Sequence, residues 1–384
     1  MPTLYHPAPL VYVAPMADPR VDKLADLLVN YSIAVQPGQK IAIQGSSLAE
    51  PLIRSVYAEV LKAGGHPFVL ATLPGLDELF YRHASDDQLE HVPPPYKLVV
   101  ETYDGLIAMM GSANTKSLSN VPPVKMARNQ RAMGEITQTF MRRHATKELN
   151  WVGTLFPTNA TAQDAEMGLA EFEDFVYGAC LPDLADPIGY WKKFSKWQQG
   201  LVEWLKGKKE VHVIGPDTDL RLSIAGRPFI NCNGRANMPD GEVFTSPVEG
   251  SVEGHVRYTY PAIYRGREVT NVRLKLEKGR VVEAKADKGQ DFLLRTLDVD
   301  EGARVPGEFA IGTNRGVTRF MRQTLFDEKI AGTFHMALGA SIPESGGTNL
   351  SAVHWDMVCD LRPGGEIRVD GELLHKNGEF VVKF

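Results

Sequence analysis

A histidine and an aspartate stand two residues apart in an otherwise apolar, strand-forming segment, LSAVHWDMVC at residues 350–359. On an extended strand successive side chains alternate between faces, so His354 and Asp356 point the same way. Burying two ionisable groups among apolar neighbours is costly unless something compensates them. A divalent cation would do so, because imidazole and carboxylate both donate lone pairs to it. The pair could instead face solvent at the margin of a sheet, and this segment by itself favours that interpretation.

Four further ionisable residues of the second half interrupt apolar runs. His335 lies in FHMAL and Glu308 begins EFAI, while Glu242 lies in DGEVF and Glu328 follows TLFD. Each acid alone is more simply a strand-end or solvent-facing group. Together with the first pair they make two histidines and four carboxylates, which suits one or two divalent ions such as zinc, cobalt, manganese or magnesium. No cysteine belongs to the set, so a catalytic site is favoured over a structural zinc site.

The first half of the chain alternates between helical and strand-like patterns. Apolar residues recur at helical spacing from Val21 to Tyr31, directly after Asp18-Pro19, a favourable helix start. A second helix is predicted over residues 48–60 and is ended by Gly64-Gly65. The alternation predicts an open α/β domain with a mostly parallel sheet over residues 1–185. The other elements predicted there are strands at 40–44, 68–70, 98–100 and 151–156 and a helix at 124–143.

The second half, residues 186–384, has a different pattern. One amphipathic helix at 190–205 is followed by short strands separated by turns. Alternating apolar residues from Val272 to Leu276, a Lys278-Gly279 turn and a second apolar run predict a hairpin. Asp370-Gly371 and Asn377-Gly378 predict two more turns. The sequence therefore predicts a C-terminal β-rich α+β domain that is largely antiparallel and carries the metal site.

Composition limits the classes of protein to which the chain can belong. The 384 residues are 43% hydrophobic and 23% charged, which is typical of a globular protein of about two domains. A net charge of −5 gives no general reason to bind nucleic acid or an anionic membrane. Three cysteines indicate a reducing compartment, and the apolar patch at residues 10–13 lacks the preceding basic residues of a signal peptide. We therefore expect a cytoplasmic protein that binds neither nucleic acid nor membrane.

Eight segments in a fixed order connect the chain to a known family. They are WVGTLFPTNATAQDAEM (151–167), EFEDFVY (171–177), MPDGEVFTSP (238–247), SVEG (251–254), DEGARVPGEFAIG (300–312), TLFDEK (324–329), FHMALG (334–339) and AVHWDM (352–357). Through them the chain resembles the thermophilic-type metalloaminopeptidases, the aminopeptidase T and aminopeptidase S type of the M29 peptidase family. The resemblance runs through nearly the whole chain.

The resemblance implies removal of single residues from the free N-terminus of peptides, at a dinuclear metal centre in a homodimer. Glu308 is the expected catalytic residue, as base or as bridging ligand, because a carboxylate must take the proton of the attacking water. Glu253 is a candidate for holding the substrate's free α-ammonium group. Carried over residue by residue, the ligands of two divalent ions would be Glu242, Glu308, Glu328, His335, His354 and Asp356.

One position departs from the family pattern. The family commonly has a tyrosine a few residues after the FHxALG histidine, whereas this chain has Ile342, which offers no donor. One alternative is a mononuclear iron(II) ring-cleaving dioxygenase of the dihydroxypyridine type, which would use His335, His354 and Asp356 alone. Retention of the three glutamates argues against it, because a single iron does not need them. The second alternative is a catalytically weakened relative that binds metal or peptide.

Overall fold

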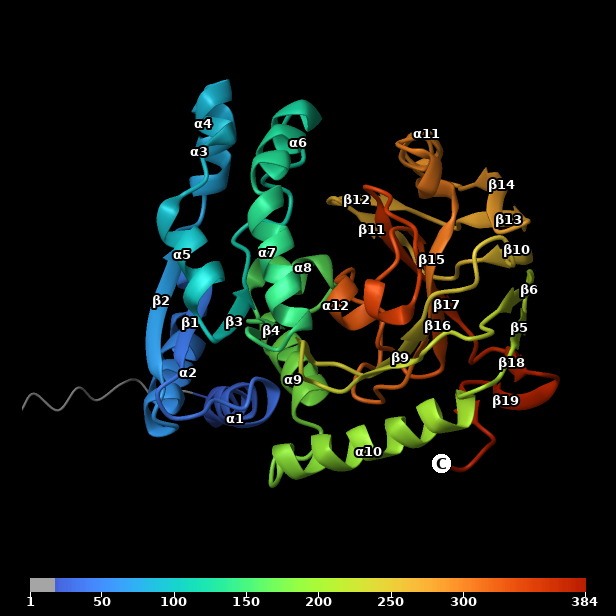
Figure 1. Ribbon diagram of the computed structural model, residues 1–384, viewed down its shortest axis with the longest axis horizontal. Coiled ribbons are helices and arrows are strands. Elements are labelled where there is room, and N and C mark those ends of the chain that lie inside the picture. Colours follow the sequence, from blue (N-terminus) through green and yellow to red (C-terminus); the bar gives the residue numbers. More distant parts are fainter. Residues whose placement is uncertain (1–17) are drawn as a thin grey trace, which may run out of the picture.

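The computed structural model describes residues 18–384, which form two parts lying side by side (Figure 1). The apolar patch at residues 10–13 lies outside the described residues. Within 18–384, every helix is too short or too polar to cross a bilayer. The combination of a parallel α/β part and an antiparallel β-rich part confirms the predicted fold class.

The first part is built on a five-stranded parallel sheet, sheet A, with strand order β2-β1-β3-β4-β8. Helices cover both of its faces, which is why its strands have short apolar runs instead of a polar face. In β1, Ile41 and Ile43 join one core and Ala42 joins the other. The strands are β1 (Lys40–Ser46), β2 (His66–Thr72), β3 (Gly105–Met110), β4 (Asn150–Leu155) and β8 (Asn237–Met238).

Three helices pack against the face of Ile41 and Ile43, namely α1 (Pro19–Leu27), α2 (Glu50–Lys62) and α9 (Leu169–Cys180). The other face is covered by α5 (Pro94–Thr102) and α7 (Gly134–Ala145). The side chain of Asp18 caps α1 by accepting a hydrogen bond from the backbone N–H of Arg20, as the Asp-Pro start predicted. The remaining helices of this part are α3 (Leu76–His83), α4 (Asp86–Glu90), α6 (Pro123–Ala132) and α8 (Asn159–Asp164).

The second part consists of two antiparallel sheets with a hydrophobic core between them. Sheet B has the strand order β14-β13-β10-β6-β5-β18-β19-β20, and sheet C has the order β17-β16-β15-β9-β7. The strands of sheet B are β5 (Glu210–Gly215), β6 (Thr218–Ser223), β10 (Glu253–Arg257), β13 (Arg273–Glu277), β14 (Arg280–Lys285), β18 (Glu366–Val369), β19 (Glu372–Lys376) and β20 (Glu379–Phe380). Those of sheet C are β7 (Ile230–Cys232), β9 (Glu242–Thr245), β15 (Pro306–Gly312), β16 (Thr333–Gly339) and β17 (His354–Asp360).

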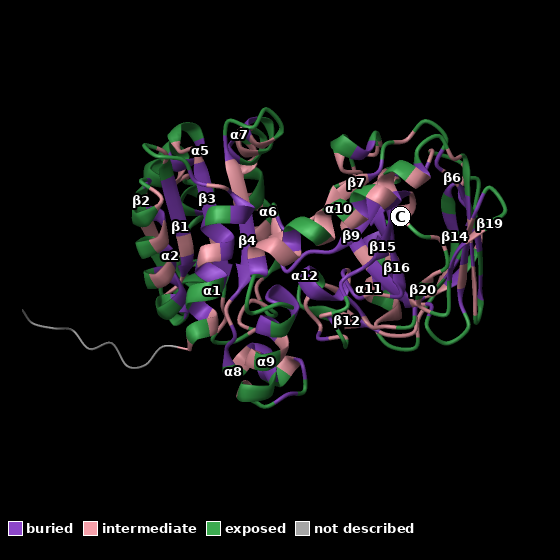
Figure 2. Cartoon of the chain, turned by 90° about the horizontal axis from the view of Figure 1, so that it is seen from below, coloured by how far each residue is buried: buried purple, intermediate pink, exposed green. Residues whose placement is uncertain are grey.

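The central strands of sheet C, β15 and β16, are buried on both faces (Figure 2). One face, with Phe309, Phe334 and Met357, packs into the core shared with sheet B. The opposite face carries the alternate residues of the same strands. A small ribbon of β11 (Ala262–Tyr264) and β12 (Arg267–Val269), with helices α11 (Gln290–Leu297) and α12 (Thr324–Asp327), completes this part.

The two parts are joined through shared structure. Helix α10 (Pro187–Leu205) places Trp191 in the first core and Leu201 in the second. Strand β8 comes from the second half of the sequence yet pairs in parallel with β4. Residues around α12, including Leu325 and Phe326, also pack into the first core. The segment that carries Glu328 is therefore held by the first part, whereas sheet C is held by the second core.

Several predicted elements are confirmed, among them β1, β2, β4, α10 and the hairpin of β13 and β14. The strand predicted at residues 98–100 is wrong, because these residues lie in α5, which Pro94 and Pro95 begin; the strand is β3, nearby. The single helix predicted at 124–143 is two helices, α6 and α7, which meet at Met133 and Gly134. Short apolar runs do not distinguish strand from helix, and glycine weakens a helix interior.

Gly339, at the end of β16, gives a test of this packing. Its φ is +103°, and an added Cβ would lie 2.0 Å from the carbonyl oxygen of Val353. We expect Gly339→Ala to lower the free energy of unfolding by about 3 kcal/mol or more, through backbone strain plus the clash. Gly364→Ala is the matched control, because Gly364 has φ +98° but open space around it, so only strain of about 1 kcal/mol is expected. Equal losses in thermal or denaturant unfolding would contradict the packing at Gly339.

Candidate metal centre

The structure brings the six predicted ligand residues together on the face of sheet C that is turned away from its core. Five come from its strands, with Glu242 on β9, Glu308 on β15, His335 on β16, and His354 and Asp356 on β17. Their strand neighbours fill the core on the opposite face, so period-two alternation places the five on one side. Glu328 reaches the same place from the residue that follows α12.

Small residues lie directly opposite the ligands in the neighbouring strands. Gly312 is paired with Glu242, Ala310 with His335, and Gly339 with His354. Ala337 lies between Glu308 and Asp356, to which it is paired on either side. These glycine and alanine partners leave the long ligand side chains room to converge, although on their other sides His335 is paired with Val358 and Glu242 with Cys232. This pairing is a property of register and could not be read from the segments separately.

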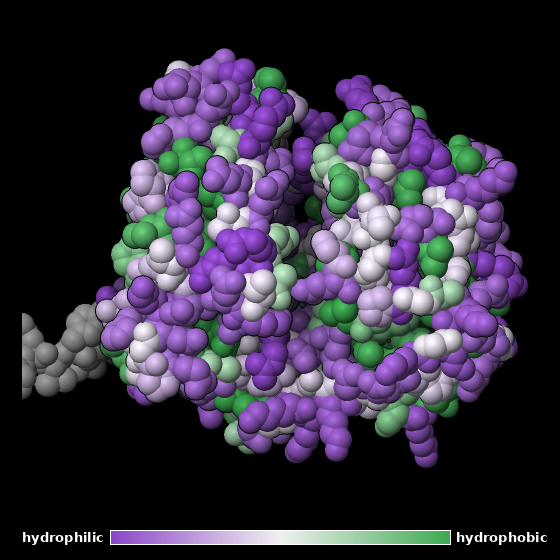
Figure 3. Space-filling model, in the orientation of Figure 1, coloured by the Kyte–Doolittle hydropathy of each residue, from purple (hydrophilic) through white to green (hydrophobic). Residues whose placement is uncertain are grey.

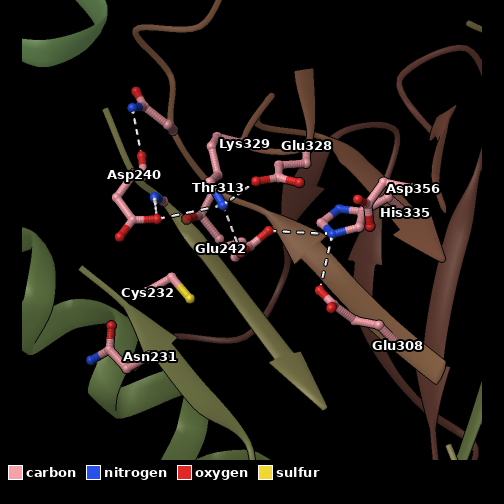
Figure 4. A network of polar contacts seen from close by, with 12 residues as sticks. Asn231, Cys232, Asp240, Glu242, Glu308, Thr313, Glu328, Lys329, His335 and Asp356 are labelled. Carbon is pink, nitrogen blue, oxygen red and sulfur yellow. Dashed lines mark hydrogen bonds and ion pairs between the residues drawn. The ribbon is translucent and has the colours of Figure 1, made fainter. Parts of the chain in front are cut away.

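The ligand atoms form two groups of three. Glu242, Glu328 and His335 make one group, and Glu308, His354 and Asp356 make the other, with the atoms of each group all within 4.8 Å of one another. Glu308 connects the groups. Its Oε1 lies 3.3 Å from His335 Nε2 (Figure 4), and its Oε2 lies 3.6 Å from His354 Nε2. Two adjacent sets of mixed imidazole and carboxylate donors, with one carboxylate between them, suit two divalent cations.

Buried side-chain oxygens that lack a hydrogen-bond partner show whether these residues fit metal ions. Oε2 of Glu242 and Oδ1 of Asp356 are buried without a hydrogen-bond partner among the described residues. Such atoms are costly to bury unless a cation or water contacts them. His354 Nδ1 lies 2.8 Å from the carbonyl oxygen of Ala340, so it carries the proton and leaves the lone pair on Nε2, on the side of Glu308 and Asp356. The donor set therefore fits metal ions.

Lys329 is the residue that the sequence analysis missed. Its side chain is completely buried, and Nζ lies 2.6 Å from Glu242 Oε1, 2.7 Å from Glu328 Oε1 and 3.6 Å from Asp240 Oδ1. The one signal in the sequence was a lysine directly after two acids in an otherwise apolar segment, FDEKI. A charged run of this kind is more often solvent-exposed, and only the structure shows that it is buried.

The charges of the group shift the pKa values of its members. Burial opposes the charge on His335, but hydrogen bonding to Glu308 and attraction to Glu242 and Asp356 outweigh it and raise the pKa of His335 to about 9. The pKa of His354 is raised in the same way, since Asp356 and Glu308 outweigh burial. Burial raises the pKa of Glu328 and, despite Lys329, raises that of Asp240 to about 6.

Glu253 does not join the group. It is exposed on β10 of sheet B, where Oε1 accepts a hydrogen bond from the backbone N–H of Lys278 at 2.7 Å. Sheet B lies on the other side of the second core from the metal-ligand face of sheet C. The substrate-binding role predicted for Glu253 therefore has no support in the structure.

The described residues enclose a large cleft and a small hollow, and the small hollow borders the ligand set. A cleft of about 790 Å³ is lined by residues of both parts, such as Lys116 and Asp164 from the first and Arg267 and Arg322 from the second. Figure 3 shows the surface hollowed between the two parts. A hollow of about 10 Å³, about one water molecule in size, borders Glu328 and Asp356 and has walls of Pro261, Ile263, Phe320 and Val358.

Comparison with known proteins agrees with this geometry. The Thermophilic metalloprotease (M29) family matches residues 17–380. The chain belongs to this family. It is 28% identical to "Aminopeptidase T" of Thermus thermophilus, over 93% of this chain and 95% of that protein. It is 25% identical to "Aminopeptidase 2" of Geobacillus stearothermophilus, over 91% of this chain and 93% of that protein. The family predicted from the sequence segments is thus confirmed.

Solved structures give the same result for the fold. Wild-type AmpT from Thermus thermophilus superposes with a TM-score of 0.82 at 26% identity, over 95% of this chain and 99% of that chain. A 2,5-dihydroxypyridine dioxygenase from Pseudomonas putida superposes with a TM-score of 0.58 at 13% identity, over 96% of this chain and 99% of that chain. The second likeness concerns the fold alone.

The raised pKa of His335 predicts a pH dependence of both stability and metal binding. In the metal-free protein, His335 contributes stability that is fully present below pH 6.5 and is lost as the pH rises through about 9. A cation needs the neutral imidazole, so its affinity should rise over the same interval. Unfolding of chelated protein and calorimetric titration with zinc or manganese, each at pH 6.5 to 9, measure the two trends. A flat metal affinity over this range would contradict the assignment of His335.

Proposed function

We propose that the chain is an aminopeptidase that removes the N-terminal residue from peptides at a centre of two divalent cations. The observation that carries this proposal is the pair of three-residue donor groups with Glu308 between them. When bound, the cations would supply Lewis acidity, which polarises the scissile carbonyl and lowers the pKa of a water molecule towards neutrality. One imidazole in each group favours zinc, cobalt or manganese over magnesium.

Glu308 is the residue proposed to move the proton. Only 3% of its surface is exposed, and its two carboxylate oxygens face the two histidines, so its position is fixed by the sheet. It would take the proton of the attacking water and return it to the leaving amine. The same carboxylate could bridge the two cations, and the two roles are compatible with this position. Glu242, Glu328, His335, His354 and Asp356 are the other proposed ligands.

Position 342 separates this chain from the usual family pattern. Ile342 precedes the short 3-10 turn Pro343–Ser345 in the loop between β16 and β17, so no hydroxyl is supplied there. Tyr260 is a tyrosine that could replace it, because the next residue, Pro261, lines the small hollow beside Glu328 and Asp356. Its hydroxyl, however, is already hydrogen-bonded to Asp360 and Arg362. We propose that hydrolysis proceeds without a tyrosine donor at this position, with water in its place.

The predicted homodimer and cytoplasmic location stay predictions.

Metal removal and replacement test the proposed function. Chelation should reduce release of the free amino acid from an unblocked dipeptide at least 100-fold, since the cations supply the nucleophile. Addition of zinc, cobalt or manganese should restore it, and an N-acetylated dipeptide should not be cleaved. Elemental analysis should give two cations per chain.

Other results would favour the rival functions. One iron per chain with oxygen consumption on a dihydroxypyridine would favour the dioxygenase, whose likeness to this chain concerns the fold alone. Bound metal without hydrolysis of any unblocked peptide would favour the catalytically weakened relative.

Substitution of Glu308 tests its role in proton transfer. We expect Glu308→Gln to lower kcat for an aminoacyl-anilide about 10²–10⁴-fold, because the amide keeps the size but cannot accept the proton. Glu344→Gln is the control, since Glu344 is an exposed acid in the loop between β16 and β17. Metal content is measured in parallel. Full activity of Glu308→Gln would refute the assignment. If the variant loses both its activity and one of its two bound cations, Glu308 acts as a metal ligand.

A further inference from the structure

Lys329 places a fixed positive charge inside the candidate metal centre. None of its surface is exposed, and its ammonium contacts one oxygen of Glu242 and one of Glu328 at 2.6 and 2.7 Å. In each case the contacted atom is Oε1. Oε2 of Glu242 lies 3.3 Å from His335 Nε2, and the second oxygen of Glu328 also points toward His335 (Figure 4). In both glutamates, Lys329 therefore contacts one carboxylate oxygen, and the other oxygen faces His335.

The backbone at Lys329 is anchored on both sides. Its N–H donates to the carbonyl oxygen of Phe326 at 2.9 Å, and its carbonyl oxygen accepts from the N–H of Asn314 at 2.9 Å. Phe326 and Ile330, close to it in sequence, are buried in the first core. The lysine therefore lies in a segment that packs into the first core and is bonded to Asn314, just after β15, and its ammonium contacts a sheet C ligand, Glu242.

Asp240 is a third acid beside the ammonium group of Lys329. Its Oδ1 lies 3.6 Å from Nζ and accepts from the N–H of Gly241 at 3.0 Å, while Oδ2 accepts from the N–H of Gly234 at 2.9 Å. With both oxygens held by the backbone, Asp240 is a rigid counter-charge. Cys232, Asp240 and Glu242 also have donor atoms within 4.8 Å of one another, but the ammonium already contacts the two carboxylates of this group.

We propose that Lys329 is a positioning residue that presents one oxygen each of Glu242 and Glu328 to the cation of the Glu242–Glu328–His335 group. This inference rests on the proposed function only in assuming that this group binds a divalent cation. Outer contacts that orient metal ligands change metal affinity 10–100-fold when they are removed. The second group, Glu308, His354 and Asp356, has no contact with Lys329 among the described ion pairs, so its affinity should not change.

A charge-balanced variant separates positioning from charge. Lys329→Met alone removes a positive charge from the site, and this loss by itself would strengthen the attraction of the site for a cation. Asp240→Asn with Lys329→Met removes one charge of each sign, so the net charge of the site is that of the wild type. We expect this double variant to bind one of two cations 10–100-fold more weakly in calorimetric titration of the chelated protein with zinc or manganese. Asp240→Asn alone keeps the amine and should lose much less.

Lys275→Met is the surface control, because Lys275 lies 2.9 Å from Glu277 and 3.8 Å from Glu283 on exposed strands of sheet B. It should leave both affinities unchanged. Wild-type affinity in the double variant would overturn the proposal, as would an equal loss at both sites. A Lys329→Met chain that binds one cation more than the wild type would also overturn it, because the ammonium would then take the place of a cation. Calorimetry does not need turnover, so failure of peptide hydrolysis is a separate outcome.

Discussion

Mutual repulsion of buried carboxylates is the constraint on which the centre of this protein depends. Asp240, Glu242 and Glu308 are each at most 5% exposed, and Glu328 and Asp356 lie beside them. At the low effective dielectric of an interior, like charges at these separations repel strongly, and positive partners are required. Lys329 and the two histidines supply part of the compensation. The buried carboxylate oxygens that lack a hydrogen-bond partner mark where the remaining positive charge belongs, which is the physical basis for a centre that binds divalent cations.

The centre also depends on the docking of the two parts of the molecule. Sheet C, backed by the second core, provides five of the proposed ligands, whereas Glu328 and Lys329 come from a segment packed into the first core. Neither core alone would assemble the Glu242–Glu328–His335 group. The small residues opposite the ligands in β15 and β16 are equally necessary, because they leave space for side chains that must converge from several strands.

The likeness to a 2,5-dihydroxypyridine dioxygenase shows how little the fold alone says about chemistry. Both that dioxygenase and AmpT superpose over nearly the whole chain, yet the two relatives compared by sequence are named aminopeptidases, not dioxygenases. The donor set is the feature that discriminates. A two-histidine, one-carboxylate set is sufficient for one iron, but here three glutamates and a buried lysine surround it.

The sequence by itself determined the fold class, the family and the residues that did not belong in apolar strands, because alternation and long ordered segments are local in the chain. His335, His354 and Asp356 were found in this way, and so was Glu308. Helix α5 was mistaken for a strand, since Leu98-Val99-Val100 has no periodicity that distinguishes the two. Only the tertiary structure decided that Lys329 is buried, that Glu253 lies beyond the second core, and that Glu308 connects two donor groups. Those facts depend on strand register and on the meeting of two cores, and contacts between residues far apart in sequence leave no pattern in a single chain.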